Sequence, residues 1–187
     1  MIAFELIYDS ANICGGENLK KLILSKGSDC IQPLKELIEQ QKHRTLVAWA
    51  LESAPQFLDI FEQKYFWDQR PRQALEIAAV WARGEIKMPE AKKAIHAAHN
   101  AATAAEGEYA AQAAARAVGH AAATVHVPTH AIGLVLYGLT AFVYASDPGQ
   151  ADQVVEGELQ RFYQRLVYWQ DNIDKLETTW APFLFRG

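Results

Sequence analysis

An alanine-rich segment with almost no charge places the strongest constraint on how this chain folds. Residues 96–145 contain eighteen alanines, and only three of the fifty side chains are charged. Alanine is the best helix former and has the smallest side chain that still carries a Cβ atom, so neighbouring helices can approach it closely. The segment should therefore be helical, and its near neutrality predicts that it is buried.

The alanine-rich segment has one polar break, at Glu106, Gly107 and Glu108. A glycine within a helical pattern often marks the place where the chain turns. We therefore favour a helical hairpin that reverses near Gly107. The alternative is one long helix that continues through this glycine.

Polar side chains follow one face of each arm of the predicted hairpin, because residues three or four apart lie on the same side of a helix. The first arm carries His96, His99, Asn100 and Thr103, and the second carries Gln112, Arg116, His120 and Thr124. If the arms are antiparallel, the two rows meet, with Thr103 near Gln112, His99 or Asn100 near Arg116, and His96 near His120.

We group the polar residues of this region as a predicted polar seam. Its members are His96, His99, Arg116, His120, Thr124, His126 and His130. Buried polar groups must be paired, so Arg116 needs a partner or contact with solvent. A histidine on an alanine-rich face is more often a hydrogen-bonded core residue than a ligand. The alternative is that the seam binds an anionic or metal-bound ligand.

The sequence gives little support for a metal site. His126 and His130 have a spacing that suits two ligands on one helix, but Pro128 lies between them and disturbs that helix. No HExxH, CxxC or carboxylate cluster accompanies the histidines, whereas a metal needs three or four converging ligands. We predict no metal, no cofactor and no catalytic residue.

Charge argues against a nucleic-acid partner. The net charge is −4, whereas nucleic-acid binding usually requires a basic face. Residues 70–95 do carry six Lys or Arg against three Glu, but a solvated helix face explains this strip at least as well as a phosphate site.

Cysteine content and apolar runs favour a cytoplasmic protein. Cys14 and Cys30 form neither a disulfide framework nor a zinc pattern, and the N-terminus lacks the features of a secretion signal. The most apolar run, residues 131–145, is shorter than the roughly 20 residues of a membrane span. We predict reduced thiols and no membrane partner.

Helical periodicity recurs along the chain, which predicts an all-α fold. We expect a single-domain multi-helix bundle or an α-α superhelix built around the alanine-rich hairpin. Residues 1–66 would supply N-terminal helices, 67–145 the core, and 146–187 a C-terminal helix and tail. We expect a short helix over 17–26, mostly buried rings in the aromatic run 57–67, a long helix over 150–176 and a docked tail. Residues 1–16 fit either a strand or a helix.

Four stretches of the core resemble a family of small helical bacterial proteins described as immunity proteins. They are DQRPRQALE (68–76), WARGEI (81–86), ARAVGHAAATVH (115–126) and THA (129–131). The resemblance covers residues 66–145, with Pro128 lying between the last two stretches. It implies a non-enzymatic cytoplasmic protein that binds and neutralises a cognate toxin of a polymorphic toxin system.

An immunity protein that acts by binding needs an exposed complementary surface rather than a reaction centre. Arg70, Arg72 and Arg83 are candidates for that surface. A structural role is the alternative, because Arg72 can pair with Glu76 and Arg70 with Asp68. Two further hypotheses stay open: a ligand-binding protein or enzyme that uses the seam, and self-association into a homodimer through alanine faces.

Overall fold

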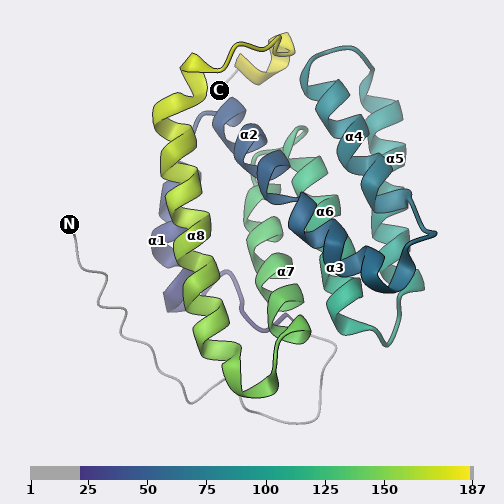
Figure 1. Cartoon of the computed structure of the whole chain (residues 1–187). Coiled ribbons are helices and arrows are strands. Elements are labelled where there is room, and N and C mark those ends of the chain that lie inside the picture. The colour runs from purple at the N-terminus through teal and green to yellow at the C-terminus, as the bar shows by residue number, and fades with distance from the viewer. Residues whose placement is uncertain (1–21, 186–187) are drawn as a thin grey trace.

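The computed structural model describes residues 22–185, which form an all-α bundle (Figure 1). The prediction of an all-α fold is confirmed. The helices are α1 (Gln32–Glu39), α2 (His43–Ser53), α3 (Pro55–Tyr65), α4 (Arg70–Ala82), α5 (Met88–Ala104), α6 (Tyr109–Thr124), α7 (His130–Ala145) and α8 (Ala151–Asn172).

The alanine-rich segment forms the predicted hairpin. Helices α5 and α6 are separated by a short turn in which Gly107 has φ of +92°. That left-handed conformation suits glycine, because residues with a side chain are strained at positive φ. The alternative of one continuous helix is therefore excluded.

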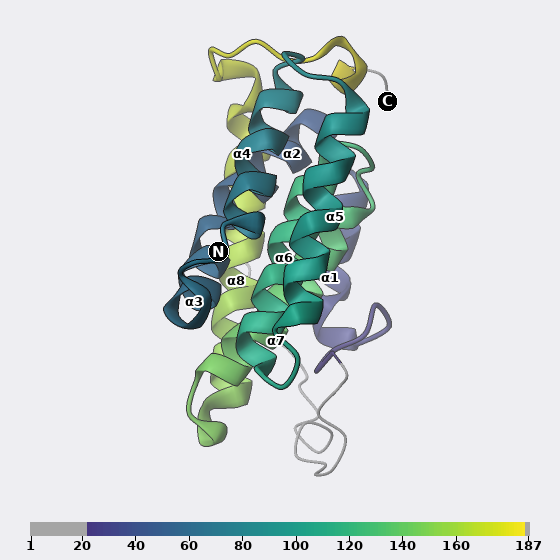
Figure 2. The same cartoon turned by 90° about the vertical axis from the view of Figure 1, so that its right-hand side faces the viewer.

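Helix α6 lies in the middle of the bundle, as both views show (Figures 1 and 2). It packs against α2, α3, α4, α5 and α7, and its alanines are buried from Ala111 to Ala123. Side chains of one carbon let five helices approach one axis, whereas larger residues at these positions would hold them apart. Alanine content thus decides which helix is central.

Pro128 separates two helices rather than kinking one. It lies in the connection between α6 and α7, and α7 begins two residues later at His130. Proline lacks an amide hydrogen and disfavours helix in the preceding residue, so α6 ends before it. Because of this break, His126 and His130 do not lie one turn apart on the same helix.

Only part of the prediction for the N-terminal residues can be compared with the structure. Residues 22–26 are not helical, so the predicted helix over 17–26 is wrong in this part. The rest of that helix, the expectation for residues 1–16 and Cys14 lie outside the described residues. Cys30 is a free thiol.

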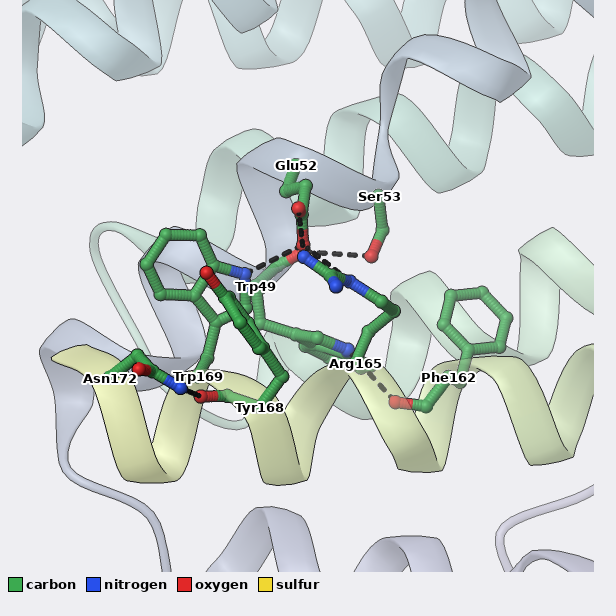
Figure 3. A network of polar contacts seen from close by, with 8 residues as sticks. All are labelled: Trp49, Glu52, Ser53, Phe162, Arg165, Tyr168, Trp169 and Asn172. Atoms are coloured by element: carbon green, nitrogen blue, oxygen red, sulfur yellow. Dashed lines mark hydrogen bonds and ion pairs between the residues drawn. The ribbon is translucent and has the colours of Figure 1, made fainter.

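A network of polar contacts joins α2 to α8 (Figure 3). The carboxylate of Glu52 accepts hydrogen bonds from the Arg165 guanidinium and, at 2.6 Å, from Trp169 Nε1. Beneath it, the buried Trp49 indole donates to the Phe162 carbonyl at 3.1 Å. These bonds attach the long last helix to a segment more than a hundred residues earlier in the chain.

The C-terminal tail packs onto the bundle, as predicted. Ala181 and Leu184 are buried, and the Ala181 amide donates to the Ala82 carbonyl at 2.8 Å. The tail lies at the same end of the bundle as the α4–α5 connection, at the top of Figure 1. The last helix is slightly shorter than predicted, because a 3-10 turn, Ile173–Lys175, follows α8.

Within residues 22–185 no helix is long and apolar enough to cross a bilayer. That the whole chain is a single domain stays a prediction.

Candidate functional site

Three histidines of the predicted seam form a row across the central helices. The ring centroids of His99 on α5 and His120 on α6 are 5.4 Å apart, and those of His120 and His130 on α7 are 5.3 Å apart. His120 Nδ1 and His130 Nδ1 lie 3.2 Å apart, so one donates a hydrogen bond to the other. We call His99, His120 and His130 the histidine row.

Two glycines make room for the row. A Cβ atom on Gly119 would lie 2.6 Å from the His99 ring, and one on Gly133 would be closer still to the His120 ring. Real side chains do not tolerate such contacts, so the rings fill space that any other residue would occupy. This packing supports the interpretation of these histidines as core residues.

Burial keeps the row neutral near pH 7. Burial, followed by the nearby charges of Arg116, His130 and His96, lowers the pKa of His99 to about 4. Burial, followed by His99 and His130, lowers the pKa of His120 to about 3. The pKa of His130 is also lowered, mainly by burial. A neutral imidazole could act as a hydrogen-bond partner here, but a protonated one is disfavoured.

The remaining seam residues are not arranged as expected. His99 rather than His96 lies against His120, and Arg116 donates to Thr103 Oγ1 at 3.3 Å. These two contacts lie about one helical turn away from the expected register, whereas Gln112 donates to the Ala102 carbonyl at 3.2 Å, beside its expected neighbour Thr103. His96 is exposed, and Arg116 lies at the edge of the hairpin rather than deep within it.

Thr124 and His126 lie apart from the row. The Thr124 hydroxyl donates back to the His120 carbonyl at 2.9 Å, and the Thr124 carbonyl accepts from His43 Nε2 at 2.7 Å. His126 packs on the Trp81 ring at 5.8 Å instead of approaching His130 as a second ligand. Among the described residues no three His, Cys, Asp or Glu side chains are placed to hold a metal ion.

An exposed pair of aromatic side chains marks a different candidate site, at the turn between α3 and α4. Phe66 is 71% exposed and Trp67 is 64% exposed. Their rings meet edge to face at 5.0 Å, and Trp67 also packs on Tyr65 at 5.7 Å. Tyr65 in turn stacks on the buried Phe61, so the exposed rings rest on the core.

Two of the three predicted surface arginines flank this pair. Arg70 donates from both Nε and Nη2 to the Asp68 carboxylate, and Arg72 binds Glu62 with Nε donating at 2.8 Å. Arg70 lowers the pKa of Asp68, mainly through these hydrogen bonds. The pairing of Arg70 with Asp68 was expected, whereas Arg72 pairs with Glu62 on α3 instead of Glu76. We call residues 66–72 the aromatic corner.

Arg83 does not belong to the aromatic corner. It follows the opposite end of α4, about 16 Å along the helix from Arg72, and pairs with Glu85. The three arginines therefore do not form one patch. A depression of about 400 Å³ beside the corner is lined by Trp67, Asp68, Gln69, Arg70 and Gln73.

The exposure of Phe66 and Trp67 was not predicted. Most rings between residues 57 and 67 were expected to be core, which is right for Phe57 and Phe61. The available signal was that Tyr65, Phe66 and Trp67 are consecutive and precede a helix start. Three neighbouring side chains point in different directions, so they cannot all face one core.

Comparison with known protein families matches residues 36–167 to the family described as "Imm-5 like putative immunity protein". The match spans more than half of the chain. The chain belongs to this family. The aromatic corner, the α5–α6 hairpin and the histidine row all lie within the matched segment of this immunity family, whereas the C-terminal tail lies outside it. The resemblance stated for residues 66–145 is confirmed, and the match extends it in both directions.

Neither the curated proteins nor the solved structures compared with this chain include a match.

Proposed function

We propose that this protein is an immunity protein that binds a cognate bacterial toxin and neutralises it in the cytoplasm of the producing cell, without catalysing a reaction. Membership of the immunity family supports this role. The observation that carries the proposed mode of binding is the exposed pair Phe66 and Trp67 within the family-matched segment.

The aromatic corner has the properties of an interface centre. Aromatic residues and arginine carry much of the binding energy at protein interfaces, because they bury a large area and combine it with polar contacts. Trp67 is held by Tyr65, and the Arg70 side chain is held by Asp68. These contacts reduce the entropy that would be lost on binding.

The partner proposed for this surface has an apolar pocket or groove with polar groups at its edge. Phe66 and Trp67 would fill the apolar part. Arg70 and Arg72 keep 38% and 42% of their side chains exposed and could donate further hydrogen bonds at the rim. Arg83 would contribute only if the partner also covered the far end of α4.

Binding should be measured with the purified toxins that are encoded beside the gene. We expect one of them to bind the native chain in calorimetric titration and to lose activity in its presence. Trp67→Ala, alone or with Phe66→Ala, should weaken that binding by about 30-fold or more, as expected for an interface hot spot.

Phe185→Ala is the matched control, because Phe185 is also exposed, at 58%, but lies outside the family-matched segment. It should bind the toxin like the native chain. Equal affinity of the native chain and the Phe66→Ala, Trp67→Ala double variant would refute the proposed surface, and failure to bind any neighbouring toxin would refute the role. Light scattering of the same proteins tests whether the corner instead mediates a homodimer.

The alternative of a ligand site on the polar seam has less support. The histidine row packs against glycines and against itself, while Arg116 donates to Thr103 and His126 packs on Trp81.

A further inference from the structure

A cavity of about 760 Å³ lies at the end of the bundle where the α1–α2, α4–α5 and α6–α7 connections meet the C-terminal tail. The tail and the α4–α5 connection appear at the top of Figure 1. This end is distinct from the aromatic corner, since none of the residues 66–72 is among the described residues that line the cavity. Its volume falls in the range of small-molecule sites, roughly 300–1,000 Å³.

The walls of the cavity are mostly apolar and partly aromatic. Trp81 contacts Phe183 at 5.6 Å between ring centroids and His126 at 5.8 Å. Ile86 from the α4–α5 connection, Met88 at the start of α5 and Pro128 from the α6–α7 connection complete the apolar lining. Flat rings and aliphatic side chains of this kind favour a ligand with a flat apolar body.

The tail forms one wall and is firmly seated. The amide of Ala181 donates to the Ala82 carbonyl at 2.8 Å. Gly84, with φ of +79°, approaches so closely that a Cβ atom there would lie 3.4 Å from the Ala181 Cβ. The cavity therefore exists only with the tail in place.

The charged group that lines the cavity is positive. Lys87 contributes an ammonium group to the lining, and among the described residues no carboxylate forms an ion pair with it. No Asp or Glu of the described residues lines the cavity, and the nearby Glu85 pairs with Arg83. His43 lines the cavity with a ring fixed by its Nε2 hydrogen bond to the Thr124 carbonyl. Because a carbonyl only accepts, Nε2 carries the hydrogen, and Nδ1 is left as an acceptor.

We infer that this cavity binds a small organic anion with an aromatic body, whose rings lie against Phe183 and Met88 and whose anionic group lies at Lys87. A cationic ligand would find no counter-charge among the described lining residues and would meet the lysine. This site goes beyond the proposed toxin binding and does not depend on it.

Anilinonaphthalene sulfonate, an aromatic anion, is the probe for this site. Calorimetric and fluorescence titration of the full chain should show saturable binding with one probe per chain. Lys87→Ala should weaken binding about tenfold, the loss expected for a hydrogen bond to a charged group. Lys92→Ala, an exposed lysine on α5 that does not line the cavity, should bind like the native chain.

Phenylnaphthylamine, which keeps the aromatic body but lacks the sulfonate, separates charge from apolar contact. It should bind more weakly than the sulfonate, and Lys87→Ala should not change its affinity. Non-saturable binding of the sulfonate, or equal effects of Lys87→Ala and Lys92→Ala, would overturn the inference. The Phe66→Ala, Trp67→Ala variant should keep full probe binding, so this test and the toxin test can fail independently.

Discussion

At the scale of single residues, two glycines of the central helices lie directly against histidine rings. His99 occupies the space beside Gly119, and His120 occupies the space beside Gly133. Glycine in a helix interior costs about 1 kcal/mol relative to alanine. The close approach of helix and imidazole must offset this cost.

Substituting these glycines should therefore destabilise the protein although alanine is the better helix former. We expect Gly119→Ala and Gly133→Ala each to lower the free energy of unfolding by about 1–3 kcal/mol, because the new methyl group overlaps a ring. Urea unfolding followed by circular dichroism measures the change.

Gly157 on α8 provides the matched control. No atom of the described chain lies within 4 Å of a Cβ placed there. Gly157→Ala should stabilise the protein by about 0.5–1 kcal/mol, because only helix propensity changes. If all three variants shifted stability in the same direction, the packing of imidazole against glycine would not matter.

The histidine row should also make stability depend on pH. An unfolded histidine titrates near pH 6.5, whereas the folded pKa values of His99 and His120 are about 4 and about 3. As the pH falls below about 6.5, the unfolded chain takes up protons that the folded chain does not. Stability is therefore fully present above this pH and is lost on acidification towards the folded pKa values.

Urea unfolding at about pH 7.5 and about pH 5 tests this dependence. The native chain should lose about 1–2 kcal/mol between them, less than the full shifts imply because the rings keep some contact with solvent. His120→Gln should show a smaller loss, while His96→Gln, at an exposed position, should behave like the native chain. An unchanged pH dependence in His120→Gln would contradict the assignment.

At the scale of helices, one carboxylate joins α2 to α8. Glu52 accepts from both Arg165 and Trp169, and these side chains are partly exposed (Figure 3). Glu52→Ala should cost about 1 kcal/mol, since exposed ion pairs contribute little but a charge-assisted bond to the indole adds to them. Glu156→Ala, at an exposed position of α8, should leave the free energy of unfolding unchanged. Equal stability of the two variants would show that this network does not attach α8.

At the scale of the whole molecule, the C-terminal tail packs against the end of α4. Leu184 is 2% exposed and its neighbour Phe185 is 58% exposed. Leu184→Ala should therefore lower the free energy of unfolding by about 2–4 kcal/mol, as for other buried leucines. Phe185→Ala removes a contact with the Arg44 guanidinium and should cost about 0.5–1 kcal/mol. A small effect at Leu184 would mean that the tail contributes little to stability.

The sequence by itself determined the helical class, and it favoured the turn at Gly107 and the central place of the alanine-rich segment. Each of these follows from local chemistry: the helix propensity of alanine, the freedom of glycine at positive φ, and the cost of burying charge. The same local reasoning identified Arg70, Arg72 and the histidines as notable residues. It also indicated the packing of the apolar tail.

Only the tertiary structure decided which of these residues meet. In the α5–α6 pair the His99 ring lies against Gly119, and sequence spacing leaves such a register open by one turn. Phe66 and Trp67 are exposed because no distant segment covers them. The cavity beside Lys87 forms because segments distant in sequence converge there. Such contacts are set by the packing of whole helices, which periodicity within one helix does not specify.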